Sequence, residues 1–325
     1  MTHSPREVIP GVFAITLPLP FELNHINLYL IRLDDGYLLV DCGLGTDASF
    51  QALEDGLRAL GIGFGDIRRI LLTHTHPDHV GQAPRLLSLT GARLLMHPEE
   101  AALLAKIADS QDRPHWLDEV LEESGVPAAM VSDIHAAFAK FRKSFRKLDP
   151  DALLAPGEML ATAIGELEVL WTPGHSPGHV CLYSPERRVL LSGDHMLPGI
   201  TPNIGWLPGQ DTLADYLSSL DLAESREVDQ VIPSHGEPFD DHRGWIRDTR
   251  AHHADRCQRI VESIAQTPKT VHEMVGDLWN FPLSPFNHRF AIFEVLAHLV
   301  YLERQGRVAP AASGSQVRWS PATAR

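Results

Sequence analysis

Three histidines and one aspartate occur within six residues, in the order His74, His76, Asp78 and His79. Imidazole nitrogen and carboxylate oxygen are the donors that suit zinc, iron or manganese. The apolar stretch 69–73 before them is typical of a short buried strand, and Pro77 cannot lie inside a central strand. This context argues against a surface loop with histidines by chance. It predicts a loop at the carboxyl end of a strand, with His74 and His76 pointing the same way.

Three more candidate ligands follow predicted strands later in the chain: His175, Asp194 and His235. Each has glycine or proline beside it, which lets the backbone turn sharply. Strand ends converge at one edge of a layered β/α fold, so these residues are expected to meet the first cluster. We predict two divalent metal ions held by seven ligands: His74, His76 and His175 on one ion, Asp78, His79 and His235 on the other, and Asp194 between them.

In order and spacing these segments resemble the motifs of the metallo-β-lactamase superfamily, including an early aspartate, Asp41, in Val40-Asp41-Cys42-Gly43. The resemblance covers about residues 10–240. It implies an α/β fold, the αββα sandwich, with a dinuclear metal site at one edge. It also implies that Asp41 supports the metal loop without being a ligand. His179 lies four residues after His175 and begins a predicted strand, so we interpret it as a hydrogen-bonding residue behind the site.

The rest of residues 1–240 alternates between strand and helix patterns. β-Branched and aromatic residues predict early strands at 12–17, 26–33 and 36–41. A helix follows with Asp47 as its predicted N-cap. Apolar runs predict later strands at 69–73, 92–96, 167–172, 179–184, 188–192 and 229–232. Residues 1–240 are therefore predicted to form the catalytic domain.

Residues 109–150 break this alternation and predict a helical insert. One helix, expected over 134–148, carries basic side chains opposite an aromatic stripe: Lys140, Arg142, Lys143, Arg146 and Lys147. We interpret the insert as packing over the core or contacting a second copy in a homodimer. Attachment to RNA or to a membrane surface is the weaker alternative, because a single basic amphipathic helix is a weak signal.

Residues 241–325 form a second predicted domain. Three short helices, one starting with a Thr270–Glu273 capping box, and a hairpin around Gly314 predict a winged-helix-like module. This tail resembles that of a β-lactamase-like hydrolase subgroup, the lactamase-B-like protein 2 group, which includes thioesterase-like and single-stranded RNA-cleaving activities. The chain is also similar to glyoxalase II through His79, His175, Asp194 and His235. It departs from glyoxalase II at Thr75, where that enzyme carries a third consecutive histidine, and in its C-terminal helices.

Charge and composition restrict the partners. Residues 1–240 hold 17 Lys and Arg against 34 Asp and Glu, a balance of −17, whereas residues 241–325 have a balance of +3. The negative field disfavours nucleic-acid phosphate. No apolar run is long enough to cross a bilayer, and the first eleven residues lack the apolar segment of a secretory signal. Three scattered cysteines indicate no disulfide framework, so we expect a cytoplasmic protein with no membrane attachment.

The seven ligands predict metal-assisted hydrolysis. Two cations about 3.5–4 Å apart can share a bridging hydroxide at neutral pH. Asp78 is the predicted catalytic residue, accepting a proton or orienting the nucleophile. We expect zinc, with iron and manganese as alternatives, and a small ester, thioester or lactone as substrate. A metal-dependent single-stranded RNA endoribonuclease is the first alternative, and a metal-binding protein without hydrolytic activity is the second. No substrate-binding residue is identified, although 109–150 and 197–208 are candidate segments.

Overall fold

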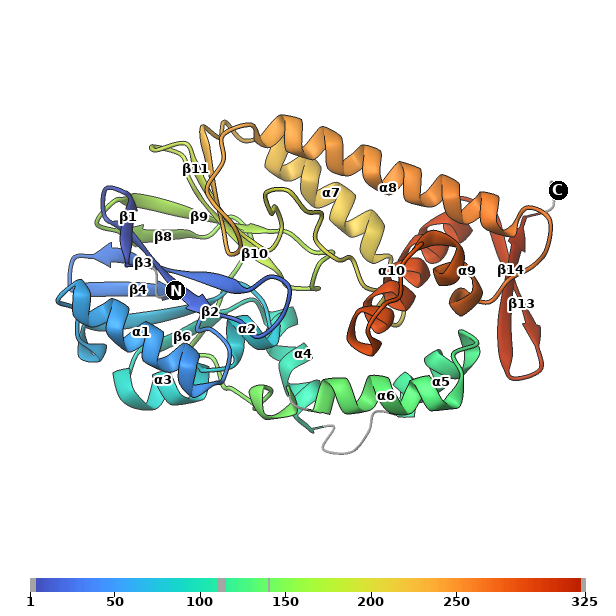
Figure 1. Ribbon diagram of the computed structural model, residues 1–325. Helices are drawn as coiled ribbons and strands as arrows, with labels where there is room; N and C mark the ends of the chain where they lie inside the picture. Colours follow the sequence, from blue (N-terminus) through green and yellow to red (C-terminus); the bar gives the residue numbers. More distant parts are fainter. Residues whose placement is uncertain (1–3, 110–114, 140, 323–325) are drawn as a thin grey trace. The chain divides into compact units, whose positions relative to one another are not determined.

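The computed structural model describes residues 4–109, 115–139 and 141–322 (Figure 1). The chain divides into two compact units, which we describe separately. The sandwich unit comprises residues 1–109, 143–202 and 219–245, and the helical unit comprises residues 110–142, 203–218 and 246–325. The domain boundary at residue 240 stays a prediction. Of the predicted insert, residues 110–114 and 140 lie outside the described residues.

The first sheet of the sandwich unit has seven strands in sequence order. They are β1 (Arg6–Ile9), β2 (Val12–Pro18), β3 (His25–Leu33), β4 (Gly36–Val40), β5 (Ile67–Leu72), β6 (Arg93–Met96) and β7 (Ala152–Leu153). The pairings from β1 to β4 are antiparallel, and those from β4 to β7 are parallel. Parallel pairing places the carboxyl ends of β4, β5 and β6 at one edge of the sheet. Asp41 and His74 lie just beyond two of these ends.

The second sheet has five strands in the order β12-β11-β10-β9-β8. Their bounds are β8 (Met159–Thr162), β9 (Gly165–Trp171), β10 (Val180–Ser184), β11 (Val189–Gly193) and β12 (Gln230–Pro233). β11 and β12 are parallel, whereas β10 is antiparallel to both of its neighbours. The start of β10 therefore lies at the same edge as the ends of β11 and β12.

The two sheets share one apolar core, built from alternate residues of each strand. Its members include Val40, Leu71, Leu95, Val169, Leu182 and Leu191. On β2, Ala14 belongs to this core, while the next residue, Ile15, faces the helix α1 (Asp47–Ala59). A Cβ at Gly56 of α1 would lie 2.5 Å from Cγ2 of Ile15. α1 therefore packs against the face of the first sheet opposite the shared core, and Figure 1 shows this helix beside the sheet.

The N-cap of α1 differs from the prediction. Thr46, rather than Asp47, has the extended backbone of a cap, and its hydroxyl accepts a hydrogen bond from the Ser49 N–H at 3.2 Å. Asp47 is the first helical residue, where its negative charge lies favourably at the positive end of the helix dipole.

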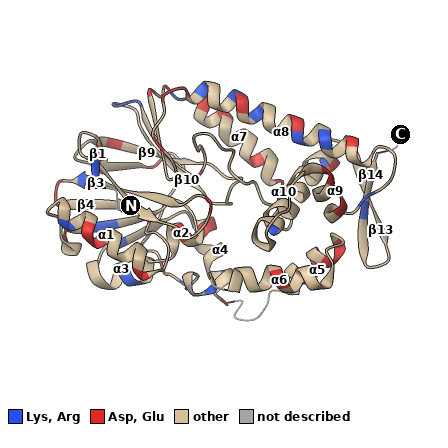
Figure 2. Cartoon of the chain, in the orientation of Figure 1, with Lys and Arg blue, Asp and Glu red and all other residues tan. Residues whose placement is uncertain are grey.

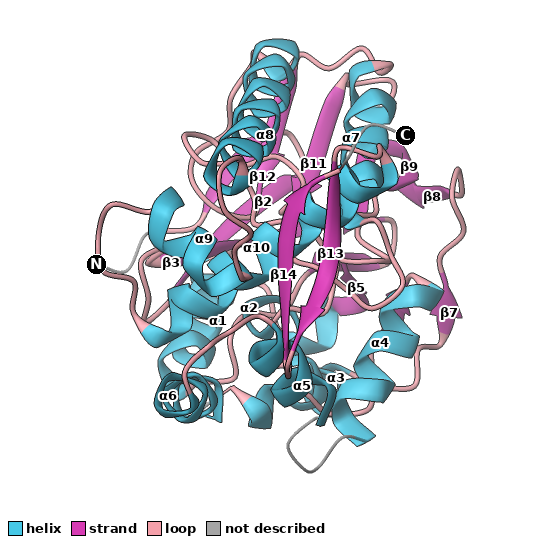
Figure 3. Ribbon diagram, turned by 90° about the vertical axis from the view of Figure 1, so that its right-hand side faces the viewer, coloured by secondary structure: helices cyan, strands magenta, loops and turns pink. Residues whose placement is uncertain are grey.

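Short helices complete the sandwich unit: a 3₁₀ turn (Phe64–Asp66), α2 (Pro77–Val80), α3 (Ala83–Thr90) and α4 (Pro98–Asp109). The helical unit contains α5 (His115–Glu123), α6 (Ala128–Ala139), α9 (Val271–Leu278), α10 (Pro285–Arg304) and the hairpin of β13 (Val308–Ser313) and β14 (Gln316–Pro321), seen in Figure 3. Two helices, α7 (Thr212–Glu224) and α8 (His242–Ile264), have residues in both units. Thr270 and Glu273 form the predicted capping box at the start of α9.

The prediction of a basic helix over 134–148 is wrong. α6 ends at Ala139 and contains no Lys or Arg, as Figure 2 shows. Arg142 lies in a 3₁₀ turn (Arg142–Ser144), residues 145–150 have no regular secondary structure, and Lys140 lies outside the described residues. Like charges three and four residues apart oppose a continuous helix here. Phe138 also stacks on Phe286 of α10, with ring centroids 4.7 Å apart.

Within the described residues, no helix combines the length and the hydropathy needed to cross a lipid bilayer.

The shared core predicts a position-dependent cost of removing a leucine. Leu182 is fully buried between the sheets, whereas Leu89 on α3 is 50% exposed. We expect Leu182→Ala to lower the free energy of unfolding by about 2–5 kcal/mol, because it loses transfer energy and leaves a cavity. Leu89→Ala should change it by about 0.5 kcal/mol or less. Urea unfolding of the full chain measures both; equal shifts in the transition would contradict this packing.

Candidate metal centre

All seven predicted ligands lie at one edge of the sandwich unit. His74 and His76 lie on the predicted loop after β5. Asp78 and His79 lie instead in the one-turn helix α2, which begins at Pro77, because proline suits the first position of a helix. His175 lies between β9 and β10, while Asp194 and His235 follow β11 and β12. The structure brings them together in two groups of mutually close donor atoms: His74, His76, His175 and Asp194 form the first group, and Asp78, His79 and His235 form the second.

Asp194 faces both groups with different oxygen atoms. Its Oδ2 lies 3.5 Å from Nε2 of His175 and 3.9 Å from Nε2 of His74, both in the first group. Its Oδ1 lies 3.4 Å from Nε2 of His79 and 3.4 Å from Nε2 of His235, both in the second group. One carboxylate therefore has an oxygen in reach of each set of imidazoles.

In three of these histidines the second ring nitrogen, Nδ1, contacts a residue outside the two groups. Nδ1 of His79 lies 2.9 Å from Oδ2 of Asp41. Nδ1 of His235 lies 2.7 Å from the carbonyl oxygen of His25, and Nδ1 of His74 lies 3.1 Å from the hydroxyl of Thr73. A carboxylate or carbonyl acceptor fixes an N–H on Nδ1, which leaves Nε2 as the lone-pair donor.

The free donor atoms fit a cation. Nε2 of His74, His79 and His235 and Oδ1 of Asp194 are buried, and they have no hydrogen-bond partner among the described residues. Buried polar atoms are normally hydrogen-bonded, because leaving one unsatisfied is costly. Several such atoms converging at one place, all of them nitrogen or carboxylate oxygen, are what a bound transition metal would satisfy. The clusters are able to bind metal.

The two groups differ in the pKa values of their histidines. Burial lowers the pKa of His74, and burial together with His175 lowers that of His76 to about 3. Burial alone would act the same way on His235, but the carboxylates of Asp194 and Asp78 raise its pKa to about 10. Burial opposes ionisation of Asp194 too, yet His79 and His235 hold the pKa of that carboxyl well below its ordinary value. Anionic carboxylates thus persist at the centre of a buried site.

Asp41 connects the ends of β4 and β5. Its Oδ1 accepts hydrogen bonds from the N–H of Thr73 at 2.8 Å and from the Thr73 hydroxyl at 3.0 Å, while Oδ2 faces His79. The residue has φ of +64°, a left-handed conformation that aspartate tolerates better than most residues. Its position agrees with a supporting rather than a ligating role.

His179 lies behind Asp194. Its Nε2 accepts a hydrogen bond from the Asp194 N–H at 3.1 Å, and its Nδ1 lies 2.8 Å from the hydroxyl of Thr172. Gly193 has φ of +52°, and a Cβ there would lie 2.6 Å from Nε2 of His179. The contact therefore requires glycine before Asp194.

Sequence reasoning missed Thr73 and His25. Thr73 contacts Asp41 and His74 through its hydroxyl, and its place directly before the motif is the only signal that could have drawn attention to it. His25 contributes its backbone carbonyl to His235, and its Nε2 accepts a hydrogen bond from the Gly236 N–H at 3.1 Å. A backbone acceptor leaves no trace in residue types, so no sequence pattern marks the carbonyl of His25.

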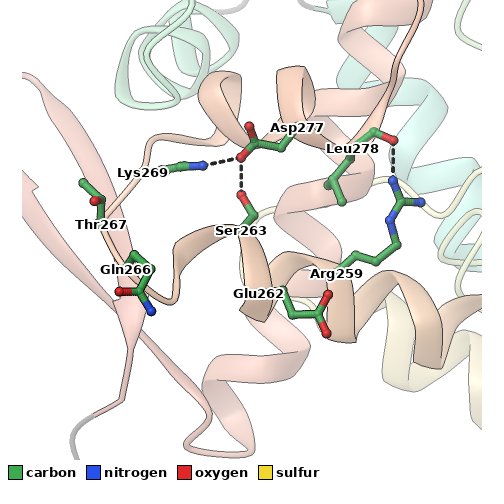
Figure 4. Close-up of a pocket in the computed structure, with 8 residues that line it drawn as sticks. All are labelled: Arg259, Glu262, Ser263, Gln266, Thr267, Lys269, Asp277 and Leu278. Atoms are coloured by element: carbon green, nitrogen blue, oxygen red, sulfur yellow. Dashed lines mark hydrogen bonds and ion pairs between the residues drawn. The ribbon is translucent and has the colours of Figure 1, made fainter.

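The helical unit has a surface cavity of about 470 Å³ between the end of α8 and α9 (Figure 4). Its charged groups already have partners. Lys269 Nζ and the Ser263 hydroxyl both lie 2.5 Å from Oδ2 of Asp277, and Arg259 donates to the Leu278 carbonyl at 2.7 Å. The buried cluster of unsatisfied donors in the sandwich unit is therefore the stronger candidate for the functional site.

Comparison with known proteins places the chain in a family. The metallo-beta-lactamase superfamily model matches residues 22–235, and the metallo-beta-lactamase-like C-terminal domain model matches residues 257–320. The chain belongs to the metallo-beta-lactamase superfamily. The predicted resemblance, the α/β fold and the enzyme class, a metal-dependent hydrolase, are confirmed.

Three similar proteins cover most of the chain. The probable metallo-hydrolase YqjP of Bacillus subtilis is 25% identical over 94% of this chain and 96% of its own length. The chicken (Gallus gallus) acyl-coenzyme A thioesterase MBLAC2 is 30% identical over 70% of this chain and 79% of its own length. The crystal structure of the metallo-beta-lactamase family protein TTHA1429 from Thermus thermophilus is 33% identical, covers 97% of this chain and 100% of that one, and has a TM-score of 0.85.

The Asp41–His79 contact predicts a loss of metal affinity in Asp41→Asn. An amide cannot offer two anionic oxygens to Thr73 and His79, so the imidazole loses its orientation and basicity. We expect metal affinity to fall about 10–100-fold, the usual effect of removing such a partner. Competition with a chelator measures it, and Asp47→Asn, on the exposed end of α1, is the matched control. Unchanged retention in a folded Asp41→Asn protein would contradict this role.

Proposed function

We propose that this metallo-hydrolase cleaves acyl thioesters, one of the ester, thioester and lactone classes predicted from the sequence. The observation that carries the proposal is the 30% identity to the chicken acyl-coenzyme A thioesterase over 70% of the chain. The match spans 239 residues, and the seven predicted ligands lie between positions 74 and 235 of this chain. The thioester is therefore preferred over the other two acyl classes.

We propose further that the site holds two divalent cations, with zinc as the expected metal. The support is the placement of Asp194, which directs Oδ2 to the first group and Oδ1 to the second. The first group would hold one ion and the second group the other, with Asp194 shared. The mixed imidazole and carboxylate donors also accept iron and manganese, which stay alternatives.

The residues themselves define the rest of the mechanism. When bound, such cations supply Lewis acidity and lower the pKa of a water towards 7. Hydrolysis adds the water oxygen to the thioester carbonyl carbon, breaks the carbon–sulfur bond and returns a proton to the departing sulfur. Asp78 is largely buried, and its Oδ2 lies 3.4 Å from Nε2 of His235. Its carboxylate is the group that would orient the water and accept its proton.

The RNA-cleaving alternative has less support. The helix α6 carries no Lys or Arg, so the predicted basic helix does not support RNA binding. Residues 1–240 also carry a charge balance of −17, which repels phosphate. A metal-binding protein without hydrolytic activity has less support too, because the similar proteins are a probable metallo-hydrolase and an acyl-coenzyme A thioesterase. The winged-helix-like C-terminal module, the homodimer, the absence of membrane attachment and the cytoplasmic location stay predictions.

The two groups predict a metal content of about two equivalents per chain. Seven donors exceed what one tetrahedral ion uses, and Asp194 has an oxygen for each group. Elemental analysis of protein prepared without chelator and supplied with metal gives the stoichiometry. A content of about one equivalent or less would refute the two-ion proposal.

The thioester proposal predicts a specific pattern across a panel of substrates. The panel comprises acyl-thioesters, lactones, bis-p-nitrophenyl phosphate and single-stranded RNA, at two salt concentrations with and without chelator. We expect thioester turnover that chelator abolishes and salt barely changes. Asp194→Ala should lose several orders of magnitude in kcat/KM while staying folded, because the core lies elsewhere. RNA cleavage that falls steeply with salt, without acyl hydrolysis, would replace this proposal with the alternative.

A further inference from the structure

Glu100 is a fully buried carboxylate that touches two ligand-bearing loops. It lies in the first turn of α4, outside every motif that identifies the metal site. Its Oε2 accepts a hydrogen bond from the hydroxyl of Thr75 at 2.8 Å. Its Oε1 accepts hydrogen bonds from the hydroxyl of Ser176 and from the Gly178 N–H, the latter at 2.7 Å.

The two loops meet Glu100 through residues that alternate with the ligands. Thr75 lies between His74 and His76, and in an extended segment successive side chains point to opposite sides. The two imidazoles face the metal site while the threonine hydroxyl reaches the carboxylate. Ser176 is the direct neighbour of His175. One carboxylate thus links the backbones that carry three of the four donors in the first group.

The loop between β9 and β10, which carries His175, also packs closely against the start of α4. A Cβ at Gly178 would lie 2.7 Å from the backbone nitrogen of Glu100 and 2.8 Å from Nδ1 of His97, so only glycine fits. The His97 ring stacks on Trp171 with centroids 5.2 Å apart and an angle of 9° between the planes. The Trp171 indole N–H donates to the Pro177 carbonyl at 3.0 Å. The loop from β9 to β10 is therefore clamped against the start of α4.

The second group is held by other residues. Asp41 orients His79, and the His25 carbonyl orients His235. The hydrogen bonds of the Glu100 carboxylate go instead to Thr75, Ser176 and Gly178. Asp41 thus contacts the second group directly and reaches His74 of the first group only through the Thr73 hydroxyl, whereas Glu100 contacts residues next to the first group.

We propose that Glu100 is a positioning residue that sets the separation of His74 and His76 from His175, and so tunes the affinity of the first group for its cation. This inference rests on the two-ion metal centre of the proposed function. A buried carboxylate is expensive to desolvate, and it is retained where several donors converge on it. Here those donors belong to the ligand loops themselves, which connects the charge to the metal site rather than to general packing.

The test compares Glu100→Gln with Glu99→Gln, its exposed neighbour on the same turn. Zn²⁺ or Co²⁺ is titrated into the metal-free full-length proteins in competition with a chelator, and the Co²⁺ absorption bands report the coordination of each ion. We expect one of the two equivalents to weaken by about 10–100-fold in Glu100→Gln, with altered Co²⁺ bands, while the other equivalent keeps its affinity. Glu99→Gln should match the wild type. Asp41→Asn should weaken the other equivalent.

Equal weakening of both equivalents, or of neither, would overturn the inference, because a merely structural residue would not distinguish the groups. If Glu100→Gln does not fold, Thr75→Val and Ser176→Ala each delete one donor and leave the carboxylate, and each should weaken the same single equivalent. Retained affinity in both would also refute the proposal.

Metal binding is read without turnover, so the proposed function can fail separately. If the wild type binds two ions but hydrolyses no thioester, the thioesterase proposal falls and the role of Glu100 is still decided by the titration. If the wild type binds one ion, the two-ion proposal falls. Loss of that ion in Glu100→Gln would then support the positioning role, and its retention would refute it.

Discussion

Asp194 is the residue on which the arrangement of the whole site depends, because its two oxygens face different sets of imidazoles. Its position follows from sheet pairing: β11 runs parallel to β12, so the residues after both strands lie at one edge. Gly193 turns the chain, and His179 receives the Asp194 N–H. Because its backbone is held in this way, the Asp194 carboxylate keeps a position between the two groups of imidazoles.

The burial of these groups explains why so much of the framework is polar. Imidazoles and carboxylates lose hydration when the sandwich closes, and each must be compensated by a hydrogen bond or by a cation. The protein supplies the hydrogen bonds on the outer side, through Asp41, Thr73 and the His25 carbonyl. The inner atoms of the same groups stay unsatisfied by protein. This asymmetry separates a metal site from an ordinary buried polar network, in which every partner is internal.

The support of the site comes from segments far apart in sequence. Residues from β3, the end of β4 and the start of α4 hold ligands that follow β5, β9 and β12. Motion of any of these segments would change the spacing of the donors. Glu100 and Asp41 both contact the segment after β5, but only Glu100 also contacts the loop between β9 and β10, and only Asp41 contacts His79 directly. Under the role proposed for Glu100, this difference would allow the affinities of the two groups to be adjusted separately.

The sequence by itself determined the fold class, and it predicted as metal-binding the seven residues that the structure brings together in two groups. Both depend on local order: a dense His-x-His-x-Asp-His segment, and donors placed directly after apolar strands. It did not determine the end of α6, where Phe138 packs on Phe286 of α10 and like charges oppose further helix. Nor did it reveal Thr46 as a cap, or the roles of the His25 carbonyl and Glu100. Helix ends and buried supports are decided by contacts between residues distant in the chain, and such contacts leave no periodicity or motif. Only the tertiary structure, which brings the strand ends of two sheets together at one edge, shows where these helix ends and supporting contacts lie.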